Sequence, residues 1–338
     1  MERTMPAHLT RRGLLSAGGG LTLAALLAAC GDGGSDASGG AGWTFTDDRG
    51  TKISLKARPK RVVAYVGAAA ALHDFGVVDQ IVGVYGPAKR KDGSRDPQVG
   101  EVDVNKVTII GNAYGEFNIE KYAALRPELL VDHVFVQPDL FYVPAESKDK
   151  IFKLAPSAGI ATGAVPLPTP IEHYAALARA LGADTKSPAV TAARARFDKA
   201  VQAVRDAVRA NPGVKVLAAS ASPDLFYASN PGKNSDLLYY KQLGVELIQP
   251  DHVGKDGYFE DLSWENADKY KADVVLLDAR TQALQPKDLG SKAAWKRLPA
   301  VRAGQVVPWD AEPRFSYAGC APLLERLATT IRNAKKVA

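Results

Sequence analysis

"IEKYAALRPELLV" (residues 119–131) and "WENADKYKADVVL" (residues 264–276) are two stretches of this chain that match in pattern without a gap. Each has a glutamate at its second position, then a proline or small residue, an acidic residue and an aliphatic run. The pattern predicts a helix that leads into a buried strand, over residues 118–132 and again over residues 263–278. A unit that recurs 145 residues later indicates that the two halves of the chain fold alike.

A second pair of stretches supports the same reading. "LHDFGVVDQIVG" (residues 72–83) resembles "YYKQLGVELIQ" (residues 239–249), and it precedes its partner stretch in the same order. Strands and helices alternate in both halves, which predicts an α/β fold with two Rossmann-like lobes and a ligand cleft between them. We expect an N-terminal lobe over residues 43–186 and a C-terminal lobe over residues 213–338.

The segment between the lobes predicts one long helix over residues 187–212. Its apolar residues fall on one face at spacings of four and three, and it ends at an Asn-Pro-Gly stop signal. The residues of that face are Ala193, Phe197, Val201, Val204 and Val208.

The N-terminus, "TRRGLLSAGGGLTLAALLAAC" (residues 10–30), is the most hydrophobic part of the chain. Its unbroken apolar run is shorter than the roughly 20 residues of a membrane span. A basic start, a short apolar core and small residues before Cys30 predict a signal peptide over residues 1–29. Arg11 and Arg12 match a twin-arginine export signal. Leu27 to Cys30 resembles a lipobox, in which Cys30 is lipidated and holds the protein on the outer face of the membrane; an ordinary secretory signal is the alternative.

Composition narrows the functional class. Residues 30–42 are rich in Gly, Ser and Asp, which predicts a flexible tether. The chain carries a net charge of +6, with charges interspersed rather than gathered among aromatics, and this argues against nucleic acid as a partner. There are two cysteines, so if Cys30 is lipidated, Cys320 has no disulfide partner, and we expect it to be buried.

The usual signatures of enzymes are missing from the sequence. It has no Walker loop, no nucleophile elbow, and no Gly-rich dinucleotide motif between a strand and a helix. The histidines show no metal-ligand spacing, so we expect neither a catalytic centre nor a protein metal site. His133 stands apart because it follows a strand end.

Aromatic residues, with a few arginines, follow the predicted strands. Ligands of open α/β sheets bind beyond the carboxyl ends of the strands. Large apolar walls with a few Arg and Tyr donors suit a bulky ligand with exposed oxygens. The segment Trp309 to Tyr317 is the strongest candidate. The predicted ligand-binding residues are Tyr65, Tyr85, Tyr114, Phe135, Tyr227, Tyr258, Arg280, Trp309, Arg314 and Tyr317.

Several motifs together carry a family resemblance over nearly the whole chain beyond the leader. They are PKRVVA (59–64), FNIEKYAALRPELLV (117–131), LLYYKQLGVELI (237–248), the repeat at 264–278 and WKRLPAVRAGQVVPWD (295–310). With these the chain resembles ferric-siderophore-binding lipoproteins of the cobalamin and siderophore class of ABC-transporter solute-binding proteins. The resemblance implies a monomer with two lobes joined by a rigid helix. It also implies docking on a permease through one acidic residue of each lobe, here Glu120 and Glu265.

The resemblance implies a ferric siderophore as ligand, with iron already coordinated by siderophore oxygens and no other cofactor. Catecholate complexes are highly anionic and would need clustered basic residues, whereas hydroxamate complexes are close to neutral. The aromatic loops, with Arg280 and Arg314 alone, favour hydroxamate. Haem or cobalamin remains an alternative, with Tyr114 or His133 as an axial ligand of haem. A secreted α/β enzyme and a structural envelope protein are the alternatives from other classes.

Overall fold

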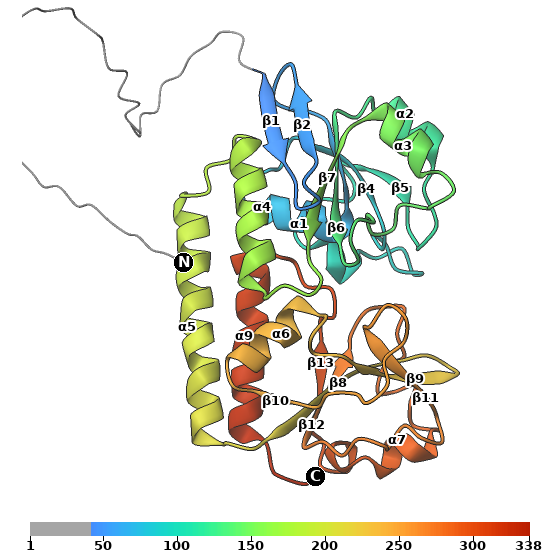
Figure 1. Cartoon of the computed structure of the whole chain (residues 1–338), viewed down its shortest axis with the longest axis vertical. Coiled ribbons are helices and arrows are strands. Elements are labelled where there is room, and N and C mark those ends of the chain that lie inside the picture. Colours follow the sequence, from blue (N-terminus) through green and yellow to red (C-terminus); the bar gives the residue numbers. More distant parts are fainter. Residues whose placement is uncertain (1–41) are drawn as a thin grey trace, which may run out of the picture. The chain divides into compact units, whose positions relative to one another are not determined.

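The computed structural model describes residues 42–338, which belong to one compact unit. The predicted signal peptide, Cys30 and the tether up to residue 41 lie outside the described residues. Figure 1 shows two α/β lobes, with long helices running along one side of both. The predicted fold class is confirmed. Within residues 42–338, no helix has both the length and the apolar character that crossing a bilayer requires.

The N-terminal lobe contains a five-stranded parallel sheet in the order β5-β4-β3-β6-β7. Its central strands, β3 and β6, are short and buried on both faces, as in a sheet covered by helices. A hairpin of β1 and β2 precedes the sheet. The strands of this lobe are β1 (Trp43–Thr46), β2 (Lys52–Leu55), β3 (Val62–Tyr65), β4 (Ile81–Tyr85), β5 (Thr108–Gly111), β6 (Leu129–Val134) and β7 (Ser157–Ala161). Its helices are α1 (Val66–Asp74), the short 3-10 helix η1 (Pro97–Val99), α2 (Ile119–Ala124), α3 (Lys148–Leu154) and α4 (Pro168–Ala180).

The C-terminal lobe contains a mixed six-stranded sheet. β8, β12 and β13 are parallel, whereas β9 is antiparallel to β8, and β11 is antiparallel to β9. The strands are β8 (Lys215–Ala221), β9 (Leu225–Ser229), β10 (Glu246–Leu247), β11 (Phe259–Ser263), β12 (Val274–Asp278) and β13 (Val306–Trp309). The helices are α6 (Ser235–Gln242), α7 (Ala293–Arg297) and α8 (Pro299–Arg302).

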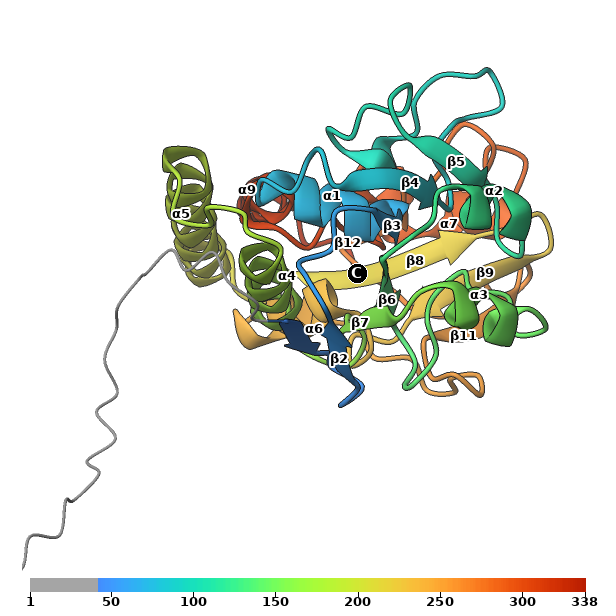
Figure 2. The ribbon, with the colours of Figure 1, turned by 90° about the horizontal axis from the view of Figure 1, so that it is seen from above.

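Two long helices connect and flank the lobes: α5 (Pro188–Ala210) and the C-terminal α9 (Tyr317–Asn333). Ser187 caps the start of α5, and the apolar stripe of α5 includes the buried Phe197, Val201 and Val204. Figures 1 and 2 show α5 and α9 side by side, and Arg196 on α5 pairs with Glu325 on α9 at 2.7 Å. The chain passes from one sheet to the other through this helical flank.

One predicted element is wrong. We expected a helix over residues 263–270, but β11 extends to Ser263 and successive tight turns follow it. Asn266 bonds back to Ser263, and Trp264 is fixed because its indole N–H donates to Ser222 O and Pro223 O at 3.2 and 3.0 Å. Side chains such as Asn266 favour turns because they bond locally to the backbone. The second copy of the repeat therefore keeps its strand, β12, but not its helix.

Candidate functional site

A cavity of about 590 Å³ lies between the lobes and is walled by residues of both. In the N-terminal lobe its walls come from the loop after β5 and the segment between β6 and α3. In the C-terminal lobe they come from the loop before β11 and the loops after β12 and β13. The lining residues include Tyr114, Phe135, Asp139, Phe141, Tyr142, Asn234, Lys255, Asp256, Tyr258, Phe259, Asp261, Arg280 and Glu312. A cavity of this size suits a small-molecule ligand.

One wall of the cavity is a cluster of aromatic rings in edge-to-face contact. Phe141 lies 4.7 Å from both Phe135 and Tyr142, and Tyr114 lies 5.1 Å from Tyr142, as measured between ring centroids. Tyr142 holds a φ of 66°, a left-handed conformation that is rare for a tyrosine. Phe141 N–H donates to His133 O, which holds this segment against the end of β6. Tyr114 is 75% exposed, so its ring is free to contact a ligand.

Tyr258 links the two lobes beside this aromatic wall. Its hydroxyl donates to the main-chain oxygen of Phe135 at 2.6 Å, and burial raises the pKa of Tyr258. Gly163 lies at this contact, where a Cβ would stand 2.1 Å from Phe135 O and 2.2 Å from the Tyr258 hydroxyl. A side chain at position 163 would therefore clash with both groups of this hydrogen bond.

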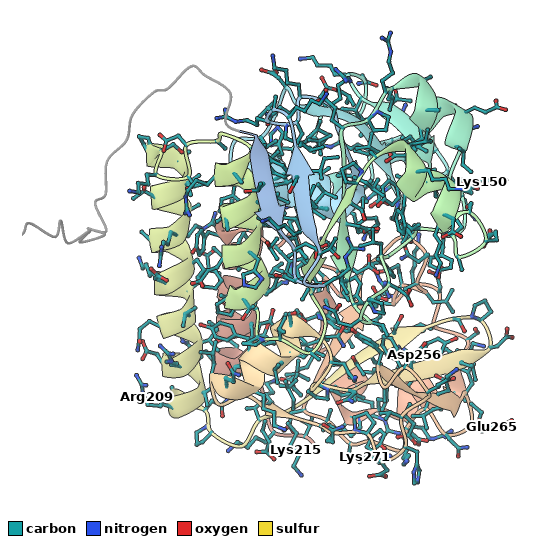
Figure 3. The ribbon with its side chains drawn as sticks, turned by 45° about the horizontal axis from the view of Figure 1, so that its top comes forward. Lys150, Arg209, Lys215, Asp256, Glu265 and Lys271 are labelled. Carbon is teal, nitrogen blue, oxygen red and sulfur yellow. The ribbon has the colours of Figure 1, made fainter. Side chains whose placement is uncertain are left out.

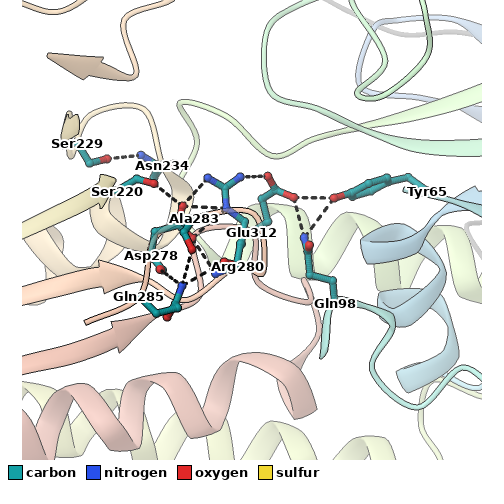
Figure 4. Close-up of polar contacts among 10 residues, drawn as sticks. All are labelled: Tyr65, Gln98, Ser220, Ser229, Asn234, Asp278, Arg280, Ala283, Gln285 and Glu312. Atoms are coloured by element: carbon teal, nitrogen blue, oxygen red, sulfur yellow. Dashed lines mark hydrogen bonds and ion pairs between the residues drawn. The ribbon is translucent and has the colours of Figure 1, made fainter. Parts of the chain in front are cut away.

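A buried polar network crosses the floor of the cavity (Figure 4). Glu312 accepts hydrogen bonds from the Tyr65 hydroxyl at 2.6 Å and from Gln98 Nε2 at 2.8 Å, and both donors belong to the N-terminal lobe. Arg280 pairs with Glu312 and, at 2.7 Å, with Asp278. Burial opposes the charge of Arg280, but the two carboxylates outweigh it and raise the pKa of the guanidinium.

This network separates the large cavity from a second cavity of about 280 Å³. Arg280 and Glu312 line both, while Arg95, Gln98 and Arg314 line only the smaller one. The two cavities are thus divided by one ion pair together with its hydrogen-bond partners.

The large cavity has an acidic lining. Asp139, Asp256 and Asp261 are exposed, and none has a side-chain hydrogen bond or ion pair among the described residues. The cations of the lining are Lys255 and Arg280, and the second is already held by two carboxylates. The lining therefore offers a ligand more unpaired negative than positive charge.

The structure brings four of the predicted ligand-binding residues to the large cavity: Tyr114, Phe135, Tyr258 and Arg280. It does not bring the other six there. Arg314 lines the small cavity, where it pairs with Asp74.

Three of the other predicted residues are the last residues of strands and turn into the core. Tyr65 is fully buried on Glu312, and Tyr85 is fully buried on Asp132, to which its hydroxyl donates at 2.7 Å. The indole of Trp309 donates to Asp236 at 2.6 Å.

Tyr227 and Tyr317 also lie away from the large cavity. Tyr227 is inside β9 with its hydroxyl 3.3 Å from Ser222 Oγ. Tyr317 begins α9 and packs on Phe75 and Phe197.

The ten predicted ligand-binding residues leave out the cavity residues Phe141, Tyr142, Phe259 and Glu312, although Glu312 lies within the candidate segment Trp309 to Tyr317. Phe259 is one of the aromatic residues that follow the predicted strands, next to Tyr258, so the same signal points to it. Phe141 and Tyr142 follow no strand directly, and only the fold of residues 135–147 brings them to the wall.

Glu120 and Glu265, the predicted docking residues, are both exposed. Glu120 lies in the first turn of α2, whereas Glu265 lies in the turns after β11, at the outer edge of the C-terminal lobe in Figure 3. Neither side chain has a partner among residues 42–338, so both are accessible to another protein.

His133, the histidine singled out from the sequence, is buried among the rings of Tyr65, Phe135, Tyr174 and Phe315. Burial lowers its pKa to about 3, and neither ring nitrogen has a partner in the described structure. Residues 42–338 contain no cluster of His, Cys, Asp and Glu that could hold a metal ion.

Solved structures of siderophore-binding proteins share the fold of this chain. DesE, described as a ferric-siderophore receptor protein from Streptomyces coelicolor, is 49% identical, with a TM-score of 0.84 over 88% of this chain and 100% of its own. The petrobactin-binding protein YclQ from Bacillus subtilis has a TM-score of 0.64 at 17% identity, over 87% of this chain and 99% of its own. A siderophore-binding protein from the fuscachelin gene cluster of Thermobifida fusca has a TM-score of 0.57 at 20% identity, over 82% and 97%. At such low identity the last two show a shared fold alone.

The sequence also matches a family model. Residues 62–313 match the family model described as periplasmic binding protein. No curated protein sequence is similar enough to count as a match. The matched region contains the five-stranded and the six-stranded sheet and every described residue that lines the large cavity. The chain belongs to the periplasmic binding protein family.

Proposed function

We propose that this protein is an extracytoplasmic, lipid-anchored binding protein that captures a ferric siderophore of the hydroxamate type and delivers it to an ABC importer permease. It acts as a monomer, binds without catalysis and uses no cofactor of its own. The observation that carries the proposal is the cavity of about 590 Å³ between the lobes, with an aromatic wall and an acidic lining. The 49% identity to DesE, a ferric-siderophore receptor, supports the ligand class.

The charge of the lining favours hydroxamates over catecholates. Three singly charged hydroxamates neutralise Fe³⁺, whereas three doubly charged catecholates leave a complex of about −3. Arg280 is committed to Asp278 and Glu312, so Lys255 is the only unpaired cation among the described lining residues. A trianion facing the carboxylates of Asp139, Asp256 and Asp261 would be repelled. A neutral complex would instead gain from apolar contact with the rings.

Titration of the protein with four ligands tests this proposal. Intrinsic fluorescence is followed as a ferric trihydroxamate, a ferric tricatecholate, haem or cobalamin is added. We expect the hydroxamate to bind more tightly than about 10 μM, roughly −7 kcal/mol, and more tightly than the other three. Tighter binding of the catecholate would refute the hydroxamate assignment. A Soret shift with haem would favour the haem alternative instead, with Tyr114 as the accessible oxygen donor.

Delivery to a permease is tested by the double variant Glu120→Ala and Glu265→Ala. We expect uptake of the ferric siderophore by cells to be lost while ligand affinity is unchanged, because both side chains are exposed and outside the cavity. The matched control replaces Glu172 and Glu246, two exposed glutamates on the N-terminal and C-terminal lobes, and should leave uptake intact. Equal loss in both double variants would contradict the docking role.

The lipid anchor and the export route have their own tests. Cys30→Ser should release the exported protein from the membrane fraction, and Arg11→Lys with Arg12→Lys should block its export. Retention of the Cys30→Ser protein in washed membranes would contradict lipidation at this residue.

A further inference from the structure

The end of the N-terminal lobe that lies opposite the cavity carries a group of exposed basic residues, which we call the basic end patch. Its members are Lys56, Arg58, Lys60, Arg61, Arg126, Arg179 and Lys186. The patch surrounds the starts of β3 and β6, whereas the cavity residues follow the ends of strands in the same parallel sheet. The sheet therefore separates the patch from the ligand.

Contacts between segments far apart in the chain bring one side of the patch together. The indole of Trp43 donates to Ala180 O at 2.8 Å, which joins the start of β1 to the end of α4. Gln80 Nε2 donates to Pro59 O and Leu181 O at 3.0 and 3.1 Å. The Arg58 guanidinium packs on Gly182, where a Cβ would stand 2.1 Å from it. These contacts place Arg58 and Lys60 next to the residues that follow α4, which include Lys186.

The other side of the patch forms around Glu128. This carboxylate accepts from the main-chain N–H of Lys60 and pairs with Arg61 at 2.6 Å. Arg61 Nε in turn donates to Arg126 O at 2.7 Å. Glu128 is thus already used by Arg61 and by the backbone.

The patch keeps a large excess of positive charge. Beside its seven cations lie three acidic residues, Asp79, Glu128 and Asp184, which leaves a net charge of +4. Residues 30–338 also carry a net charge of +4. The positive and negative charges outside the patch therefore cancel. The exposed Val78 beside it adds an apolar side chain at the same edge.

The patch also surrounds the place where the described chain begins. Trp43 bonds to Ala180, which follows Arg179, and pairs with Leu55, which precedes Lys56; twelve residues separate Trp43 from Cys30. Twelve residues span at most about 40 Å when fully extended. A lipid on Cys30 would therefore hold this end of the lobe close to the membrane, where phospholipid headgroups meet the patch.

From this charge and this position, we propose that the basic end patch binds the anionic headgroups of the membrane surface. A polybasic segment next to a lipid anchor is a second membrane signal, and each Lys or Arg adds to the attraction for anionic lipid. The patch and the cavity lie at opposite edges of the sheet, so membrane contact leaves the cavity open to the ligand. The siderophore assignment does not enter this proposal, and the anchor enters only through the position of Cys30.

Vesicle binding tests the proposal with the chain from Gly31 to Ala338, which contains the whole compact unit and lacks the lipid. One set of vesicles holds equal parts of phosphatidylglycerol and phosphatidylcholine, and the other holds phosphatidylcholine alone. We expect binding to the anionic vesicles only, at low salt. It should be lost at about 1 M salt, where the screening length falls to about 3 Å.

The decisive variant reverses Lys56, Arg58 and Lys60 to glutamate, and it should weaken binding to anionic vesicles by more than about tenfold. The control reverses Lys241, Lys287 and Lys296, three exposed lysines of the C-terminal lobe without side-chain partners in the described structure. It imposes the same change of net charge and should bind almost as well as the parent chain. Circular dichroism confirms that both variants are folded.

Three outcomes would overturn the proposal: no binding to anionic vesicles at low salt, equal binding to phosphatidylcholine alone, or equal weakening in the control. The last would show attraction by overall charge rather than by the patch. Failure of the siderophore titration would leave these results unaffected, so the two proposals fail separately.

Discussion

Glu312 ties the two lobes together, and its replacement by alanine gives the most direct test of the floor network. Its carboxylate accepts from Arg280, from the Tyr65 hydroxyl at 2.6 Å and from Gln98 at 2.8 Å. Removing one partner of a buried ion pair costs about 3–5 kcal/mol. Arg280 still pairs with Asp278 in this variant, so the cost of losing the ion pair should lie near the lower limit of that range. The Tyr65 hydroxyl then becomes a buried donor without its acceptor, at a cost of about 1–3 kcal/mol.

We therefore expect Glu312→Ala to lower the free energy of unfolding by about 4–6 kcal/mol. Tyr65→Phe removes one donor from a carboxylate that keeps two others, and it should cost about 1–2 kcal/mol. The double variant should show a coupling of about 1–2 kcal/mol, because one hydrogen bond is shared by both changes.

Urea unfolding at neutral pH measures these differences as shifts of the midpoint at constant slope. Glu172→Ala, at an exposed glutamate, serves as the control and should stay within about 0.5 kcal/mol of the parent. A loss below about 1 kcal/mol for Glu312→Ala, or strict additivity in the double variant, would show that the network does not stabilise the closed arrangement of the lobes.

Three further changes have distinct expected outcomes. Tyr114→Ala should weaken ferric hydroxamate binding about tenfold, seen by fluorescence titration, with little change in stability because the ring is 75% exposed. Burial lowers the pKa of His133 to about 3, so the unfolded chain binds the extra proton between about pH 6.5 and 3. Stability is then lost as the pH falls through that window, by up to about 4–5 kcal/mol, and His133→Phe should remove this slope from urea titrations. Burial raises the pKa of Asp236 to about 7, so the native state holds the extra proton and stability falls as the pH rises from about 4 to 7. Asp236→Asn, which keeps an acceptor for Trp309, should gain stability over the parent at pH 8 but not at pH 4, and an unchanged difference between these pH values would refute the assignment.

The two-lobed fold could be predicted because short-range sequence patterns specify its elements and recur in both halves of the chain. Each signal depends on residues that are close together in the sequence. Examples are the cap at Asn118, the apolar stripe of α5 and the aliphatic runs of β6 and β12. The antiparallel pair of β9 and β11 could not be predicted in the same way. Its strands are separated by about thirty residues, and their pairing depends on tertiary contacts that no local period reveals.

Whether a predicted residue reaches the cavity depends on its position relative to the end of its strand, which the sequence analysis did not take into account. Tyr65, Tyr85 and Trp309 are the last residues of their strands, where the side chain still obeys the alternation of the sheet and turns into the core. Phe135 and Arg280 lie one and two residues beyond a strand end, where the backbone is free to turn, and both reach the cavity.

Tyr65 faces the core, but it still has a role in the site because its buried hydroxyl bonds to the other lobe. Tyr65 is followed at once by α1, so no loop separates it from the core, and its ring is fully buried. A buried hydroxyl needs a partner, and Tyr65 finds it in Glu312 of the other lobe. Glu312 then holds Arg280, which lines the cavity. Tyr65 was predicted to contact the ligand, but it instead positions a cavity residue, Arg280, through Glu312. Tyr65→Phe should therefore weaken ligand binding only as far as it loosens Arg280.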